Sequence, residues 1–163
     1  MGALNIMTKK VEEIQTNWRN LLPPDVKAEV SSDAVELGNE DWRRKLDPAA
    51  FEVLRHEGTE RPFTSPLNDE HRAGVFVCAG CGQPLFTSDM KYDSGSGWPS
   101  FFTTIPGSLE TSTDYKLLMP RNEYHCTRCG GHHGHVFEDG PLPTGTRFCN
   151  NGVSLKFVPK NKT

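Results

Sequence analysis

The apolar positions of this chain change their period, from a helical spacing in the first half to a strand-like spacing in the second. The clearest helical segment reads LDPAAFEVLRHEG. Asp47 is placed to cap a helix, Pro48 occupies its first position, and Gly58 can end it. Phe51 and Leu54 would then lie on the face that packs against a core.

Short apolar runs with strand character begin at Gly74. They read GVFVC, DYKLLM and VSLKFV, at residues 74–78, 114–119 and 153–158. In the last run every second residue from Val153 to Phe157 is apolar, with Ser154 and Lys156 between them, as in a half-buried strand. Turn-forming stretches such as SGSGWPS and EDGPLPTG separate the runs. An early helix followed by antiparallel strands predicts a mostly β, α+β domain.

The composition is that of a folded protein with an ordinary hydrophobic core. The 163 residues, 35% hydrophobic and 24% charged, suffice for one domain. A net charge of −3 gives no basis for binding nucleic acid or an anionic membrane surface. The chain has no run of about 18 apolar residues and no apolar stretch typical of a secretory signal. We therefore expect a cytoplasmic protein without nucleic-acid or membrane partners.

Four of the five cysteines form two CxxC pairs, and a glycine follows each pair. The pairs with their glycines are Cys78, Cys81, Gly82 and Cys126, Cys129, Gly130. Each pair can bend both sulfurs toward one point, and a glycine with positive φ would let the chain turn beneath a metal. Four thiolates at this spacing predict a closed tetrahedral Zn²⁺ site that joins two distant segments. The alternatives are two disulfides or a redox-active CxxC, and a reducing compartment favours zinc.

Four of the six histidines lie between His125 and His135, and the pattern leaves three interpretations open. One is a second metal site, which would require further ligands, preferably carboxylates. Another is a solvent-exposed polar loop. The third is acid–base chemistry beside Cys149, because histidines donate protons and an imidazolium lowers the pKa of a nearby thiol.

Cys149 is the cysteine left outside the pairs. Alternate side chains of a strand share a face, so Arg147 and Asn151 would point the same way as Cys149. A neighbouring arginine lowers the pKa of a thiol and favours the nucleophilic thiolate. The alternative is a small buried side chain, the usual position of a free cysteine.

The loop SGSGWPSFF favours a ligand site over that alternative. Trp98 on a glycine-rich loop forms either a lid on the core or the wall of an apolar pocket, and the segment alone does not decide between them.

Five segments, in order, resemble the methionine-R-sulfoxide reductases of the B type. They read TERPF (59–63), CAGCGQPLF (78–86), SGSGWPSF (94–101), CTRCGGHHGHVFEDGP (126–141) and RFCNN (147–151). The resemblance extends from about Asn39 to Val158, so we assign residues 1–38 to an N-terminal extension and residues 39–163 to the reductase domain. It implies two antiparallel β-sheets with peripheral N-terminal helices and a structural Zn²⁺ held by the four paired cysteines.

The resemblance also implies an activity and its residues. The expected reaction is thiol-dependent reduction of methionine-R-sulfoxide, preferably in oxidised proteins or peptides, through a sulfenic acid on the nucleophile. The implied catalytic residues are Cys149 as nucleophile, His132 and His135 as active-site histidines, and Asn151 in support. The implied substrate-binding residues are Trp98, Arg147, Asp139 and Phe148.

One position departs from the pattern of many family members. They have a resolving cysteine in SGCGWPSF, where this chain has Ser96. The other four cysteines are assigned to zinc, so we expect a one-cysteine enzyme. Its sulfenic acid would be reduced by thioredoxin or by a small thiol such as glutathione.

Two other function classes compete with the reductase. A non-catalytic zinc-stapled β module would bind proteins through the aromatic loop and would not need Cys149 as a thiol. A thiol hydrolase would use the same cysteine and histidines, but it requires an oxyanion-binding site that the sequence does not reveal.

Overall fold

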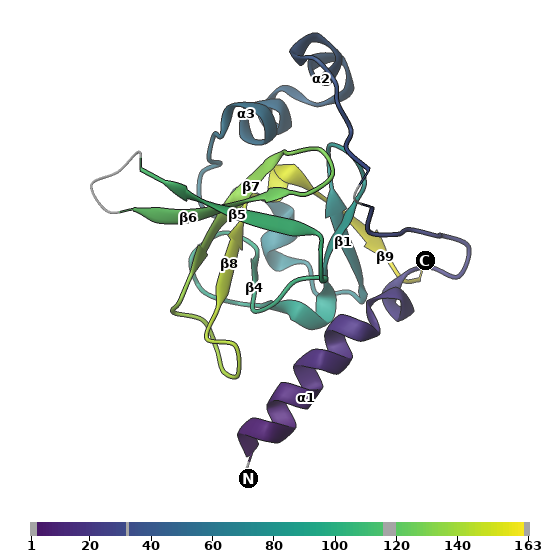
Figure 1. The fold of residues 1–163 in the computed structure, drawn as a ribbon, viewed down its shortest axis with the longest axis vertical. Coiled ribbons are helices and arrows are strands. Elements are labelled where there is room, and N and C mark those ends of the chain that lie inside the picture. Colours follow the sequence, from purple (N-terminus) through teal and green to yellow (C-terminus); the bar gives the residue numbers. More distant parts are fainter. Residues whose placement is uncertain (1–2, 32, 116–119, 162–163) are drawn as a thin grey trace.

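The strands form two antiparallel sheets in this computed structural model, which describes residues 3–31, 33–115 and 120–161 (Figure 1). The three-stranded sheet has the order β2 (Pro84–Thr87), β1 (Gly74–Cys78) and β9 (Leu155–Pro159). The six-stranded sheet has the order β3 (Lys91–Tyr92), β4 (Ser100–Phe101), β8 (Arg147–Asn150), β7 (His132–Phe137), β6 (Arg121–Cys126) and β5 (Leu109–Asp114). The predicted mostly β, α+β architecture with two antiparallel sheets is confirmed.

Helices lie at the periphery of the sheets. The α-helices are α1 (Ala3–Thr16), α2 (Asn39–Lys45) and α3 (Pro48–His56). The 3₁₀ turns are η1 (Trp18–Leu21), η2 (Pro66–Asp69), η3 (Ser88–Met90) and η4 (Gly152–Ser154). Figure 1 shows α1 extending from one end of the molecule, with α2 and α3 at the other end. None of the helices in the described part of the chain has the length and apolar character needed to cross a membrane.

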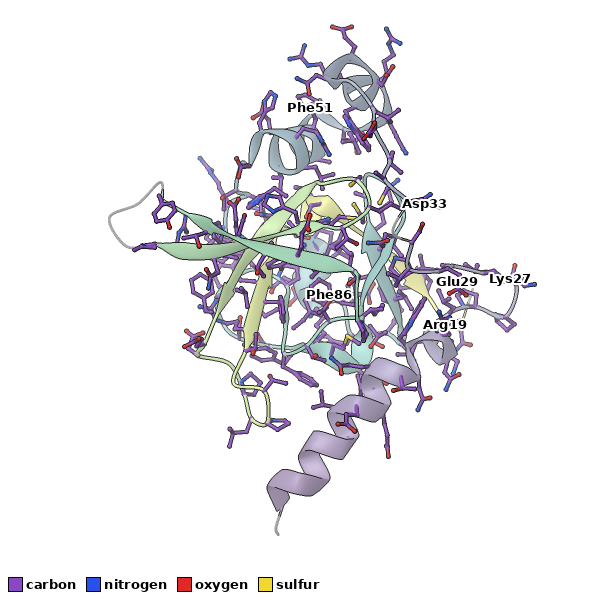
Figure 2. The ribbon with its side chains drawn as sticks, viewed as in Figure 1. Arg19, Lys27, Glu29, Asp33, Phe51 and Phe86 are labelled. Carbon is purple, nitrogen blue, oxygen red and sulfur yellow. The ribbon has the colours of Figure 1, made fainter. Side chains whose placement is uncertain are left out.

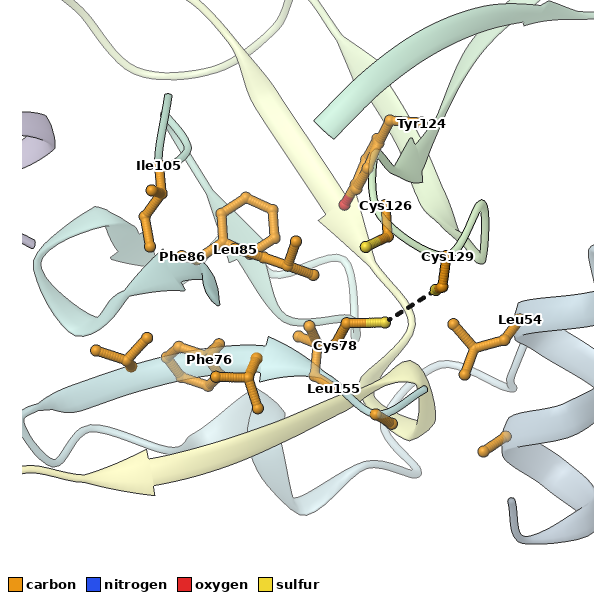
Figure 3. Close-up of a cluster of buried hydrophobic side chains, with 14 of the residues drawn as sticks. Leu54, Phe76, Cys78, Leu85, Phe86, Ile105, Tyr124, Cys126, Cys129 and Leu155 are labelled. Carbon is orange, nitrogen blue, oxygen red and sulfur yellow. Dashed lines mark hydrogen bonds between the residues drawn. The ribbon is translucent and has the colours of Figure 1, made fainter. Parts of the chain in front are cut away.

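Aromatic side chains from both sheets form the centre of the core. Phe76 and Phe86 of the three-stranded sheet and Phe101 and Tyr124 of the six-stranded sheet are fully buried. Figure 3 shows Phe76, Phe86 and Tyr124 in this cluster. The rings of Phe86 and Phe101 stack with centroids 3.9 Å apart, and Phe76 meets Phe101 edge-on at 5.1 Å. Burial of each such side chain contributes about 1.5–3 kcal/mol. These contacts hold the two sheets face to face.

The N-terminal extension packs against this core. Trp18 and Leu22 are buried and belong to the same apolar cluster as the sheet residues. Arg19 and Glu29 form an ion pair on the surface of the extension, where Figure 2 shows both side chains. The helix α2 begins at Asn39, the residue where we place the start of the reductase domain, and this boundary stays a prediction.

The predicted helix is present as α3, and its apolar face is confirmed. Phe51 and Leu54 are 5% and 2% exposed, so both side chains lie in the core. Asp47 occupies the N-cap position, but its side chain makes no capping hydrogen bond among the described residues.

The helix α3 ends one residue earlier than the position of Gly58 predicted. Glu57 takes the left-handed conformation, with φ of 56°, and the N–H of Gly58 then donates to the carbonyl oxygen of Glu52. The N–H of Glu57 donates to the same carbonyl oxygen, so the left-handed Glu57, the residue before the glycine, makes the turn that ends the helix.

The three predicted strands agree with the structure to different degrees. The run at 74–78 is β1 and is confirmed. The run at 114–119 meets β5 at Asp114, and its residues 116–119 lie outside the described residues. In the last run the strand begins only at Leu155, because Val153 and Ser154 belong to η4. The predicted exposure of Ser154 is wrong: its hydroxyl is buried and donates to the carbonyl oxygen of Asn151.

Candidate active site

The four paired cysteines converge at the junction of the two sheets. Their sulfur atoms all lie within 4.8 Å of one another. Cys78 Sγ is 3.7 Å from Cys129 Sγ, as Figure 3 shows, and Cys81 Sγ is 3.5 Å from Cys126 Sγ. Zinc–sulfur bonds of about 2.3 Å in a tetrahedron place the sulfurs about 3.8 Å apart, so the arrangement fits Zn²⁺.

Both turns of the cluster use the predicted glycines. Gly82 has φ of 81° and Gly130 has φ of 73°, which confirms the expected positive φ after each CxxC pair. Cys78 ends β1 of the small sheet and Cys126 ends β6 of the large sheet. A metal held here would therefore join the two sheets.

Polar donors surround the sulfur atoms. Gln83 Nε2 lies 3.6 Å from Cys126 Sγ and donates to the carbonyl oxygen of Ser108 at 3.0 Å. His133 Nε2 lies 3.3 Å from Cys78 Sγ. Burial lowers the pKa of His133 to about 3, so the ring is neutral and can donate one N–H to a thiolate. These donors favour the charged form of the cysteines, which is the metal-binding form.

Cys149 lies in β8, between β4 and β7 of the large sheet. Side chains alternate along β8: Arg147 and Cys149 line a cavity of about 280 Å³, whereas Asn150 is fully buried on the other face. Gly134 in β7 permits this arrangement, because a Cβ there would collide with the carbonyl oxygen of Cys149. The residues lining the cavity are Thr59, Ser96, Trp98, Arg121, Gly134, His135, Phe137, Arg147, Cys149 and Asn151.

Opposing effects act on the Cys149 thiol. Burial raises its pKa above the ordinary value, while the charge of Arg147 and a hydrogen bond from Ser96 lower it. The expected effect of the arginine is present, but burial outweighs it. Arg147 is held in place by two hydrogen bonds to Asp139, of 2.8 and 3.2 Å, and its guanidinium lies 4.3 Å from the Phe137 ring centroid.

The loop of residues 94–98 forms one wall of the cavity. Trp98 lines the cavity, which favours the pocket-wall interpretation of this residue over the lid. Its Nε1 donates to the carbonyl oxygen of Glu60 at 3.1 Å. Ser94 Oγ links the hydroxyls of Ser96, at 2.8 Å, and Ser100, at 2.7 Å. This chain of hydroxyls fixes Ser96 beside Cys149.

Asn151 connects three segments around the cavity. Its Oδ1 accepts a hydrogen bond from the N–H of Glu60, and its Nδ2 donates to the carbonyl oxygen of His133, both at 2.9 Å. Because Glu60 also holds Trp98, Asn151 positions the aromatic wall as well as bordering the cavity.

Two of the histidines face the same side of β7 because of a β-bulge. Tyr124 of β6 pairs with Gly134, but His125 pairs with His132, so β7 contains one extra residue at His133. Without the bulge, His132 and His135 would point to opposite faces. With it, their rings lie 5.5 Å apart on one face.

His135 and His132 have different relations to the thiol. His135 is the direct cross-strand neighbour of Cys149 and lines the cavity. His132 is 1% exposed, lies outside the cavity lining, and has its Nδ1 3.7 Å from Glu123 Oε2. His132 and His133 are both buried, so the exposed-loop interpretation of the histidine cluster is excluded for these two residues.

Phe148 and Asp139 do not meet the cavity. Phe148 packs in the aromatic core, with its ring 5.3 Å from Tyr124 and 5.9 Å from Phe86, so nothing in the geometry supports a substrate contact. Asp139 lies outside the cavity lining; it holds Arg147, and its charge raises the pKa of Cys149.

The cavity lining also includes Thr59, Arg121 and Phe137, which were not predicted from the sequence. A sequence signal was available for Phe137, which lies two residues after His135 on the same strand and therefore on the same face. Thr59 begins the segment TERPF, whereas Arg121 had no distinguishing signal.

Comparison with known proteins places this chain in one family. A model of the SelR domain family matches residues 46–159. The peptide methionine sulfoxide reductase MsrB of Bradyrhizobium diazoefficiens is 49% identical over 138 residues, which cover 84% of this chain and 99% of that protein. Proteins of the same name from Methanosarcina barkeri and Agrobacterium fabrum are 50% and 47% identical; they cover 78% and 81% of this chain, and 91% and 98% of their own lengths.

Proposed function

The chain belongs to the SelR domain family and is a B-type peptide-methionine (R)-S-oxide reductase, and on this premise we propose that Cys149 reduces the sulfoxide through a sulfenic acid. The observation that supports this assignment is the position of the thiol. Cys149 borders a cavity opposite His135, beside Trp98, and apart from the four-cysteine cluster. Family membership also decides against the non-catalytic binding module and the thiol hydrolase.

The reaction uses the groups that line the cavity. The Cys149 sulfur attacks the sulfoxide sulfur, and the sulfoxide oxygen gains a proton from His135, directly or through water. The oxygen is transferred, so a thiol and a sulfoxide become a sulfenic acid and a thioether. Trp98 receives the methyl group of the substrate against its ring.

The thiol begins this reaction with a raised pKa. Burial favours the neutral thiol in the free protein, and Arg147 and Ser96 supply the charge and hydrogen bond that stabilise the thiolate as it forms. The proton released by Cys149 has His135 as a neighbour across the strands. Asn151 and Asp139 also act through other residues. Asn151 holds Glu60, which positions Trp98, and Asp139 positions Arg147.

Recycling of the sulfenic acid requires an external thiol. Cys149 is the one cysteine of the chain outside the cluster, and Ser96 occupies the position where relatives have a resolving cysteine. Two equivalents of thiol restore Cys149 and release water and a disulfide. Thioredoxin and glutathione are the candidate reductants in the cytoplasm, where we place the protein.

Zinc is the metal that best fits the four-cysteine cluster. Its role is structural, since four thiolates close the coordination sphere and join the small sheet to the large one.

The decisive test is an assay on resolved R and S epimers of a methionine-sulfoxide peptide, with dithiothreitol as reductant. We expect turnover of the R epimer alone, and trapping of the oxidised enzyme by dimedone after one turnover without reductant. The Cys149→Ser variant should lose all turnover because a hydroxyl is a poor nucleophile at neutral pH. Activity above a few per cent of wild type in that variant would remove Cys149 from the mechanism.

A further inference from the structure

A second group of metal-ligating side chains lies next to the cavity, where α3, β6 and β7 meet. One ligand atom from each of four residues lies within 4.8 Å of the others: Glu57, Glu123, His125 and His132. These residues come from distant parts of the chain. Glu57 follows the last residue of α3, Glu123 and His125 share a face of β6, and His132 begins β7. The hypothesis of a second metal site required carboxylates beside the histidines, and the fold brings two of them there.

The distances within this His₂Glu₂ cluster are those of a coordination shell. His125 Nε2 lies 3.3 Å from Glu123 Oε1, and His132 Nδ1 lies 3.7 Å from Glu123 Oε2. Metal–ligand bonds of about 2.0–2.2 Å in a tetrahedron place neighbouring nitrogen and oxygen ligands about 3.4 Å apart. Small side-chain rotations would therefore suffice to surround an ion.

Two residues of the cluster are buried, and the other two are accessible to solvent. His132 and Glu123 are 1% and 7% exposed, and the Ser112 hydroxyl donates to Glu123 Oε1 at 3.2 Å. His125 is half-buried, and Glu57 is exposed to solvent. An ion can thus enter past Glu57 and meet two buried ligands that are already in place.

The charges of the cluster also favour a cation. The carboxylates of Glu57 and Glu123 lie within 4.8 Å of each other, and like charges at this separation repel in a half-buried site. Burial raises the pKa of Glu123, and the neighbouring Glu57 raises it further. Two carboxylates and two neutral imidazoles bind a divalent ion with no net charge left over.

We propose that Glu57, Glu123, His125 and His132 form a second metal site for one divalent first-row transition-metal ion, separate from the four-cysteine cluster. Imidazole nitrogens with carboxylate oxygens suit zinc, cobalt, nickel and iron, whereas Mg²⁺ and Ca²⁺ prefer oxygen ligands alone. The site does not depend on the catalytic role of Cys149.

The test adds Co²⁺ to the full chain already loaded with one Zn²⁺, in the Cys149→Ser variant so that no free thiol competes. We expect a second metal ion per chain by elemental analysis after desalting, with the first Zn²⁺ retained. The bound Co²⁺ should show d–d absorption without a sulfur-to-cobalt charge-transfer band, because its ligands are nitrogen and oxygen.

Two matched substitutions on the same background locate the ion. Glu57→Gln removes one exposed ligand, and we expect it to weaken Co²⁺ binding at least about tenfold. Glu52→Gln makes the same change of charge on the exposed surface of α3 and should leave binding unchanged. Binding of only one metal per chain, or equal Co²⁺ affinity in the Glu57→Gln and Glu52→Gln variants, would overturn the proposal.

Discussion

His133 Nε2 lies 3.3 Å from Cys78 Sγ, and Nδ1 of the same ring lies 3.5 Å from Nδ2 of Asn150, the residue after Cys149. The imidazole is fully buried between the four-cysteine cluster and β8. His133 therefore links the four-cysteine cluster to β8 without bordering the cavity.

Replacing His133 with leucine should loosen the metal without altering substrate binding. A hydrogen bond to a charged group is worth about 1.5–3 kcal/mol, and leucine fills much of the same volume without donating to Cys78. We expect faster transfer of zinc to a chromogenic chelator and a lower free energy of unfolding, with an unchanged KM. An unchanged rate of zinc transfer would show that His133 does not stabilise the cluster.

The Cys126→Ser variant should lose its metal and much of its stability. Where the ligands join distant segments, the free energy of metal binding contributes to the stability of the fold, so we expect the free energy of unfolding to fall by several kcal/mol. Elemental analysis and urea unfolding measure the two effects on a Glu57→Gln background, which weakens the second metal site proposed above, with Cys149→Ser on that background as the control that keeps one zinc per chain. If Cys126→Ser retains zinc and unfolds at the wild-type urea concentration, the four-cysteine site is wrong.

Trp98→Ala should impair substrate use more than stability. The ring borders the cavity, and an aromatic–methyl contact is worth on the order of 1 kcal/mol or more when water is excluded. We expect KM to rise roughly five- to tenfold for a methionine-R-sulfoxide peptide, while Trp98→Phe keeps most of the contact. A destabilised variant with a normal KM would instead assign Trp98 to the core.

The reactivity of Cys149 should increase with pH into the alkaline range. Burial raises the thiol pKa, so the thiolate fraction at neutral pH is small and grows as pH approaches that pKa. Alkylation by iodoacetamide should therefore show an apparent pKa above about 8.5, the value of a free thiol. Ser96→Ala should move it further upward, since the Ser96 hydrogen bond lowers the pKa. A plateau of the alkylation rate below pH 8 would contradict this assignment.

Ser96→Cys should convert the enzyme to one that resolves its own sulfenic acid. Ser96 and Cys149 line the same cavity, and a hydrogen bond from Ser96 lowers the pKa of Cys149, so we expect a thiol at this position to attack the oxidised sulfur with a high effective concentration. After one turnover without reductant, a peptide map should show a disulfide between positions 96 and 149, and dimedone labelling should disappear. Ser94→Cys, on the same loop, is the control expected to keep the label. Persistent labelling of Ser96→Cys would mean that the loop does not bring the two sulfurs together.

The sequence by itself determined the parts of the fold that depend on residues close together in the chain: single helices, single strands and tight turns. The helix around Phe51 and Leu54 follows from apolar spacing and a proline at its start. The strand at 74–78 follows from a short apolar run bounded by turns. The two turns that carry the four-cysteine cluster follow from the CxxC spacing and the glycines after each pair, because a few consecutive dihedral angles set their geometry. The motifs around Trp98 and Cys149 likewise indicated which segments border the cavity.

The tertiary structure alone decided which side chains meet across the sheets. The bulge in β7 turns His132 and His135 to one face and His133 to the other, although a regular strand would separate His132 from His135. The same register directs Phe148 into the core and places Glu123 beside His132. Hydrogen bonds between strands far apart in the chain set this register, and one extra residue reverses the facing of every side chain beyond it. No local pattern of hydrophobic and polar residues specifies where that residue is accommodated.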